Sequence, residues 1–154
     1  MGIDSSTPQS SVALVKDGQV IEQAQVDSDS ISNQVLVLID RILVNSRTKL
    51  NDLDGFCLTV GPGSFTGLRI GASILKGLLL ATSKPFVKID TLESIALMAM
   101  PTNKKICTIL DAKKKELYTA HFQPTIEIPE RLSLDPALTP NQLCQEIKEP
   151  TVFI

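Results

Sequence analysis

A glycine-rich loop at residues 61–67 joins two apolar segments, and this arrangement restricts the fold more than any other feature of the sequence. The run 56–60 before the loop has the composition of a buried strand, and the segment after it is predicted to be helical to about Ser83. A strand, a tight turn and a helix in this order form the repeating unit of α/β sheets. We therefore predict an α/β protein.

Short strands and helices are predicted along the rest of the chain. Asp17-Gly18 lies between two apolar runs and predicts a two-residue hairpin turn, because both residues tolerate positive φ. The spacing of apolar residues predicts a helix over 31–45. Asp90 followed by Glu93 predicts the start of another helix, and Thr139 with Gln142 predicts a third. The other predicted strands lie at 3–4, 12–15, 20–26, 85–89, 106–110, 117–122 and 151–154.

The segment 101–103 is predicted to separate two domains, 1–100 and 101–154, because Pro-Thr-Asn interrupts the pattern and strands resume after it. A strand that ends in aspartate occurs at Asp4 and again at Asp111, which indicates two related halves. The chain stops in an apolar, strand-like run. We expect either a fragment or a version with a short second domain.

Composition disfavours several classes of protein. Fifteen Lys and Arg against 17 Asp and Glu give a net charge of −2, which disfavours a stand-alone nucleic-acid binder. Three widely spaced cysteines do not form a disulfide framework, so a cytoplasmic protein is expected. No signal peptide is recognised at the N-terminus. The apolar stretch 67–81 contains Arg69 and Lys76, so we expect no membrane span.

The glycine loop has two interpretations. A glycine loop between a strand and a helix can bind phosphate through backbone N–H groups. Here Leu68-Arg69 follows Gly67 where a P-loop has Lys-Ser/Thr, and Thr66 replaces the third glycine of the dinucleotide pattern. These departures favour the alternative, a tight turn with close packing of the helix on the sheet.

The helix after the loop is apolar around most of its circumference, with only a narrow stripe of Arg69, Ser73 and Lys76. A surface helix needs one apolar face, so this helix must be covered on two sides. Small residues along it would let another backbone approach closely; they are Gly67, Gly71, Ala72 and Gly77. A protein–protein interface and a central helix covered by its own domain are equally compatible with the pattern.

Three polar features have structural and functional interpretations. Asp4, Ser5 and Thr7 in the first turn could present a carboxylate and hydroxyls to Mg²⁺ and phosphate, or cap their own backbone. The same two interpretations apply to the turn at Asp111. His121 is the single histidine, so neither a metal site nor a catalytic triad is expected.

Three motifs carry a resemblance to a known family. Gly2-Ile3-Asp4-Ser5-Ser6-Thr7, Gly61-Pro62-Gly63-Ser64-Phe65-Thr66-Gly67-Leu68-Arg69-Ile70-Gly71 and Asp111-Ala112-Lys113 with Glu116-Leu117-Tyr118 resemble the TsaB (YeaZ) family. These are the bacterial non-catalytic subunits of tRNA threonylcarbamoyladenosine synthesis. The resemblance covers residues 3 to about 118.

The resemblance implies an actin-like (ASKHA, ribonuclease H-like) fold of two mixed-sheet lobes, the second incomplete or short here. It implies a TsaD-type catalytic partner, which modifies adenosine 37 of tRNAs that read codons beginning with A. A TsaE-type P-loop ATPase joins the larger complex, and tRNA is contacted only indirectly. It also implies a homodimer when alone, no catalytic residue, no metal and no cofactor.

The family pairs through helices of its first lobe. On the matching helices here, the expected partner interface comprises Val35, Ile39, Arg69, Ile70, Ser73, Ile74, Gly77 and Leu78. Asp4, Ser5, Thr7 and Asp111 would be vestigial phosphate loops. TsaD-type enzymes hold a metal with two histidines on one helix, and this chain has no such pair. The alternative is a nucleotide-dependent transferase or kinase that uses Asp4, Thr7 and Asp111 in an actin-like cleft.

Overall fold

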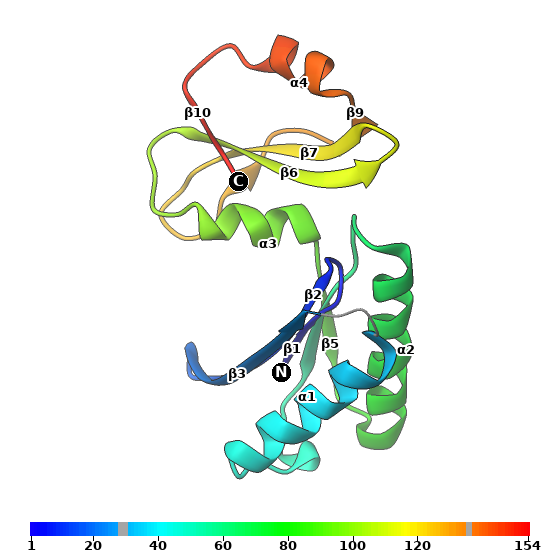
Figure 1. Ribbon diagram of the computed structural model, residues 1–154. Coiled ribbons are helices and arrows are strands. Elements are labelled where there is room, and N and C mark those ends of the chain that lie inside the picture. Colours follow the sequence, from blue (N-terminus) through cyan, green and yellow to red (C-terminus); the bar gives the residue numbers. More distant parts are fainter. Residues whose placement is uncertain (28–30, 135–136) are drawn as a thin grey trace. The chain divides into compact units, whose positions relative to one another are not determined.

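The chain divides into two compact units, Met1–Ile89 and Asp90–Ile154. The computed structural model describes residues 1–27, 31–134 and 137–154 (Figure 1). The division falls before helix α3 (Thr91–Met98) and not at Pro101, so the predicted domains 1–100 and 101–154 require correction. The reason is that α3 packs Leu92 and Ala96 into the core of the second unit.

The first unit is built on a five-stranded mixed sheet. Its strands are β1 (Gly2–Asp4), β2 (Gln9–Lys16), β3 (Gln19–Asp27), β4 (Phe56–Thr59) and β5 (Phe86–Ile89), in the order β3-β2-β1-β4-β5. Neighbours β1, β2 and β3 are antiparallel, whereas β1–β4 and β4–β5 are parallel. Asp17 and Gly18 join β2 to β3 with φ of 50° and 74°, which confirms the predicted hairpin turn.

Helices α1 (Ile31–Asn45) and α2 (Phe65–Thr82) pack into the same core as the sheet (Figure 1). A short 3₁₀ helix, η1 (Leu50–Asp52), precedes β4. Alternate strand residues such as Ile3, Val12 and Leu58 meet Leu38 of α1 and Leu75 of α2. Because both helices cover one face of the sheet, their outer sides point away from it in the same direction.

The second unit has its own five-stranded sheet. Its strands are β6 (Lys105–Lys113), β7 (Glu116–Gln123), β8 (Glu130–Arg131), β9 (Ala137–Leu138) and β10 (Thr151–Phe153). The path is β10-β6-β7-β8, with β9 also paired to β7, and only β10–β6 is parallel. Strand β6 continues past Asp111 to Lys113, so the predicted strand end at Asp111 was wrong.

Both helix starts predicted for this unit are confirmed. The Asp90 carboxylate accepts a hydrogen bond from Glu93 N at 2.9 Å at the start of α3. At the start of α4 (Pro140–Glu146), Thr139 and Gln142 form a reciprocal capping box.

The three cysteines are free thiols in different environments: Cys144 is exposed, Cys57 half-buried and Cys107 buried. Burial raises the pKa of the Cys107 thiol to about 11, and the nearby Glu146 carboxylate adds to this effect.

The thiolate is the reactive form of cysteine, so iodoacetamide at pH 8 should alkylate Cys144 first and Cys107 last. Peptide mass spectrometry over time gives the order, and labelling in urea is the control. Equal rates at Cys107 and Cys144 in the folded chain would contradict this environment.

Candidate functional site

The glycine loop packs directly against the turn that follows β1. Ser64 N donates to the Ser6 carbonyl O at 2.6 Å, and Ser64 Oγ accepts from Gly67 N at 3.2 Å as the cap of α2. A Cβ atom at Gly63 would overlap the Ser6 carbonyl, and one at Gly67 would overlap the Ser5 carbonyl. The loop therefore has the geometry of a tight turn with close helix packing.

The hydroxyls predicted for phosphate serve the chain's own backbone. Ser5 is buried, and its Oγ donates to the Gly67 carbonyl O at 2.9 Å. Thr7 Oγ1 donates to the Gln9 carbonyl O at 2.9 Å. Both contacts favour the structural interpretation of this turn.

Asp4 is held in a fixed orientation at the end of β1. Its Oδ1 accepts from Ser6 N at 2.8 Å, from Ser6 Oγ at 2.7 Å and from Thr59 Oγ1 at 2.5 Å. Three donors on one oxygen tie the end of β1 to the turn that follows β1 and to the end of β4. The phosphate or metal interpretation of this turn rests on this carboxylate.

Asp111 belongs to the second unit and caps its own turn. Its side chain accepts from Lys113 N at 2.7 Å and pairs with Lys113 Nζ at 3.0 Å. The hydrogen bond from Lys113 N, followed by the contacts of the Lys113 side chain, lowers the pKa of Asp111 below its ordinary value.

Helix α2 is long and apolar enough, by length and composition, to cross a bilayer: it has 18 residues and a mean hydropathy of 1.3. Arg69 and Lys76 therefore do not by themselves exclude a membrane span by this measure, as the sequence analysis expected them to. Only 17% of the helix is buried within the chain. The exposed residues of the helix include both apolar side chains, Phe65 and Leu80, and the polar stripe of Arg69, Ser73 and Lys76.

The small residues of α2 fall on two different sides. Gly67 and Gly71 are buried, and Ser5 approaches both so closely that an added Cβ would overlap it. Ala72 and Gly77 are exposed, and a Cβ added at Gly77 would meet no atom within 4 Å. The inner pair thus serves the chain's own fold, and the outer pair leaves room for another backbone.

Two large apolar side chains are exposed on α2, a helix that also exposes the polar residues Arg69, Ser73 and Lys76. On α2, Phe65 is 68% exposed and Leu80 is 79% exposed, and the Arg69 guanidinium lies 3.8 Å from the centre of the Phe65 ring. On α1, Leu36, Val37 and Val44 are also exposed. We call this set the α1–α2 outer face; it comprises Leu36, Val37, Val44, Phe65, Ala72, Gly77 and Leu80.

The predicted interface residues separate by burial. Arg69, Ser73 and Gly77 are exposed on α2. Ile70, Ile74 and Leu78 are half-buried, the last two against the core.

The prediction for α1 requires correction. Val35 is 0% and Ile39 4% exposed, so both side chains are occupied in the chain's own core and are not presented to a partner. Sequence analysis missed Leu36 and Val37 as interface candidates. The available signal was that these apolar residues lie outside the 3/4 spacing of the helix.

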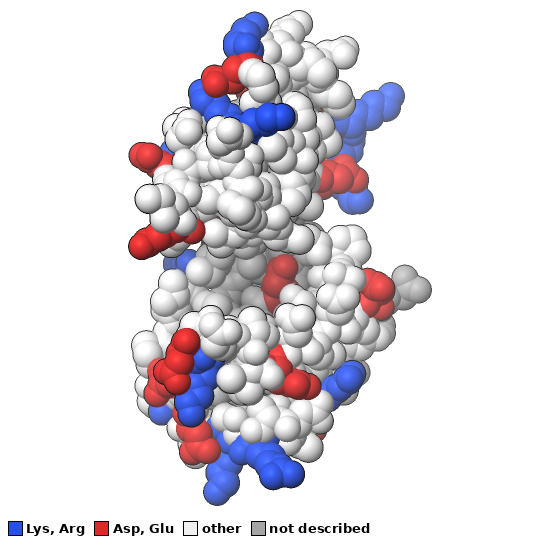
Figure 2. All heavy atoms as spheres, turned by 90° about the vertical axis from the view of Figure 1, so that its left-hand side faces the viewer, with Lys and Arg blue, Asp and Glu red and all other residues white. Residues whose placement is uncertain are grey.

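His121 lies on β7, with Nε2 3.5 Å from Glu146 Oε2. Across the described part of the chain, no three His, Cys, Asp or Glu side chains gather as a metal-binding group. On the face shown in Figure 2, basic and acidic side chains are interspersed.

Solved structures identify the class of fold. YeaZ from Pseudomonas aeruginosa superposes with a TM-score of 0.83 and 25% identity, over 90% of this chain and 66% of that one. A second structure, described as an uncharacterized protein similar to peptidase YeaZ from the same organism, gives a TM-score of 0.85 at 23% identity, over 97% of this chain and 68% of that one. The protein is therefore an α/β protein of the actin-like (ASKHA) class.

Sequence relatives define the family. The TsaB protein of tRNA threonylcarbamoyladenosine biosynthesis from Escherichia coli K12 is 34% identical over 80% of this chain and 54% of its own length. That of Haemophilus influenzae Rd is 33% identical over 77% of this chain and 51% of its own. The family model described as TsaD, tRNA N6-adenosine threonylcarbamoyltransferase, matches residues 22–137. The chain belongs to this family, and its predicted resemblance to TsaB (YeaZ) is confirmed. It spans about half the length of these curated relatives.

Proposed function

We propose that this chain acts in tRNA threonylcarbamoyladenosine synthesis as a non-catalytic subunit that binds and activates a TsaD-type enzyme. The enzyme would form N6-threonylcarbamoyladenosine at position 37 of tRNAs that read codons beginning with A. In this proposal the chain works in the cytoplasm and contacts tRNA only through its partner. The names of its relatives and the matching family model support the assignment.

The observation that carries the proposal is the α1–α2 outer face. Phe65 and Leu80 are more than two-thirds exposed, and a Cβ added at Gly77 of the same helix would meet no atom within 4 Å. Burying such a face removes apolar area from water, and the small residues allow close helix packing. Binding to the active arrangement of the enzyme alone would stabilise that arrangement by mass action.

The same face explains the homodimer proposed for the chain alone. A self-complementary surface can pair two copies about a two-fold axis. The homodimer and the TsaD-type heterodimer would then compete for one surface. A TsaE-type P-loop ATPase would join the heterodimer and not the homodimer.

The test is co-purification of the 154-residue chain with a TsaD-type enzyme, followed by light scattering on a sizing column. We expect a one-to-one complex whose rate of threonylcarbamoyladenosine formation exceeds that of the enzyme alone. Absence of a complex contradicts the proposed partner. A complex without a rise in rate contradicts activation.

The alternative is a nucleotide-dependent transferase or kinase, and the fixed Asp4 carboxylate is the observation that favours it. Calorimetry of the isolated chain with Mg-ATP distinguishes the two functions. A subunit that acts by binding its partner should bind Mg-ATP weakly or not at all. A Kd below about 10 µM that is lost in Asp4→Ala would support the enzyme instead.

A further inference from the structure

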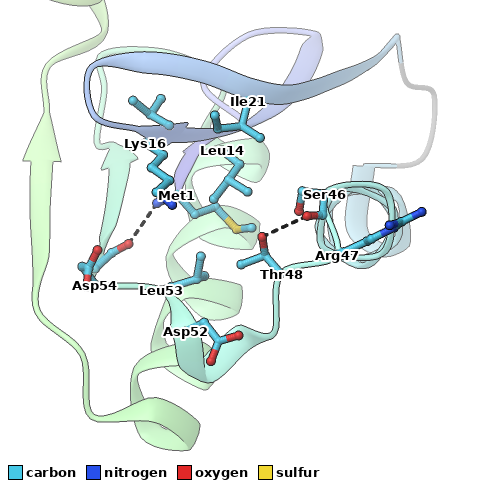
Figure 3. A pocket seen from close by; sticks show the side chains of 12 residues that line it. Met1, Leu14, Lys16, Ile21, Ser46, Arg47, Thr48, Asp52, Leu53 and Asp54 are labelled. Atoms are coloured by element: carbon cyan, nitrogen blue, oxygen red, sulfur yellow. Dashed lines mark hydrogen bonds between the residues drawn. The ribbon is translucent and has the colours of Figure 1, made fainter.

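A cavity of about 590 Å³ lies at one end of the first unit, away from the outer sides of α1 and α2 (Figure 3). The end of the β2–β3 hairpin forms one wall, and the turn after α1 forms a second. The segment between η1 and β4 forms the third wall. This volume is within the range of natural small-molecule sites.

Five of the twelve residues that line the cavity have large apolar side chains. Leu14 of β2 and Leu53 after η1 are both buried in the core and contribute to its lining. Ile21 and Val15 of the hairpin also line it and remain about half exposed, at 48% and 50%. A ligand with an apolar body would cover side chains that now contact water.

Two opposite charges on facing walls have no partner among the described residues. Lys16 extends from the hairpin toward the segment that carries Asp54 (Figure 3). No ion pair of either side chain is found within the part of the chain that the structure describes.

The remaining charged residues of the wall are less available. Asp52 accepts a hydrogen bond from Lys49 N at 3.2 Å, and the Arg47 side chain points away from the cavity (Figure 3). The Met1 ammonium also lines the cavity and donates to the Gly55 carbonyl O at 2.9 Å, so it adds a second positive charge on the side of Lys16 (Figure 3). Lys16 and Asp54 are the two charged side chains at the mouth that have no partner among the described residues.

We propose that this cavity binds a small zwitterionic molecule with an apolar body, of the class of an α-amino acid with an aliphatic side chain. A simple anion would be attracted by Lys16 and the Met1 ammonium and repelled by Asp54, and a simple cation would meet the reverse. A zwitterion complements both charges, while its apolar body contacts Leu14 and Leu53. The inference is independent of the proposed function, because it uses none of the α1–α2 outer face.

Three matched six-carbon probes test the charge requirement: L-norleucine, hexanoate and hexylamine. Each is titrated into the whole ¹⁵N-labelled chain, and amide shifts are followed at Thr48, Leu53 and Lys16. We expect norleucine to shift these amides with a Kd on the order of 1 mM or below, at least about tenfold tighter than either singly charged probe.

Two variants test the roles of the charges without touching the core. Lys16→Met should weaken norleucine and hexanoate but not hexylamine, whereas Asp54→Asn should make hexanoate the tighter probe, because Lys16 and the Met1 ammonium both remain. Lys88→Met, at an exposed lysine of β5, is the matched control and should leave all three affinities unchanged. The proposal is overturned if no probe shifts the lining amides, if all three bind equally, or if neither variant changes the order. None of these outcomes bears on binding of a TsaD-type partner.

Discussion

Gly67→Ala should destabilise the first unit by about 3 kcal/mol or more, the largest effect we expect from removing or adding a single methyl group. Gly67 is buried at the start of α2, and its missing Cβ is the space that the Ser5 carbonyl occupies. The added Cβ would clash with main-chain atoms of Ser5, which are held in place by strand β1 on one side and by helix α2 on the other. Neither side can move without breaking the Ser64 N to Ser6 O or the Ser5 Oγ to Gly67 O hydrogen bond. Urea denaturation followed by circular dichroism measures the loss.

Gly77→Ala is the matched control for this prediction, because it makes the same change in the same helix. A Cβ at Gly77 meets nothing within 4 Å, so the variant should gain up to about 1 kcal/mol from helix propensity. Similar stabilities for the two variants would show that the Ser5 turn does not pack on α2 as described.

Local chemistry made several elements of the fold predictable. Asp17-Gly18 determined a hairpin turn because few residues accept two consecutive positive φ values. Asp90 and Thr139 marked helix starts because a side-chain oxygen there satisfies a free backbone N–H. Each of these signals spans at most four residues, so the local sequence is sufficient to predict the turn or the helix start.

The domain boundary depended on contacts that are distant in sequence. Pro101 interrupts the local pattern, but α3 before it packs against Ile106 and Phe122 in the second unit. Asp90 marks the start of α3, but nothing in the local sequence shows that this helix belongs to the second unit. The division is determined by which sheet buries Leu92 and Ala96, and that depends on residues up to thirty positions away.

The sequence predicted which helices carry the candidate surface, but not which of their residues are exposed on it. Apolar spacing identifies a buried side of α1, and Val35 and Ile39 lie on it. The pattern does not distinguish burial by the chain's own sheet from burial by a partner. On α2 the sequence likewise left open whether the small residues face the chain's own core or a partner. The close contact with the Ser5 carbonyl shows that Gly67 faces the chain's own core.

Leu80→Asp should abolish both self-association and binding to a TsaD-type enzyme while leaving the fold intact. Leu80 is 79% exposed on α2 and contributes to the α1–α2 outer face. A carboxylate buried there without a partner would be strongly unfavourable, so affinity should fall at least about tenfold. Ile74 and Leu78 would be poorer probes, because both also pack against the core. Sedimentation velocity measures self-association, and co-elution with the enzyme measures the complex.

A second variant and a control make this prediction specific to the surface. Leu36→Asp places the same charge on the α1 side of the outer face and should act in the same direction. Leu132→Asp changes an exposed leucine of the second unit, 49% exposed, and should leave both associations unchanged. If Leu80→Asp and Leu36→Asp remained folded and associated as the unchanged chain does, the α1–α2 outer face would not be the interface. If Leu36→Asp alone lost the complex, α1 would carry the contact, and the open space beside Gly77 would have no part in it.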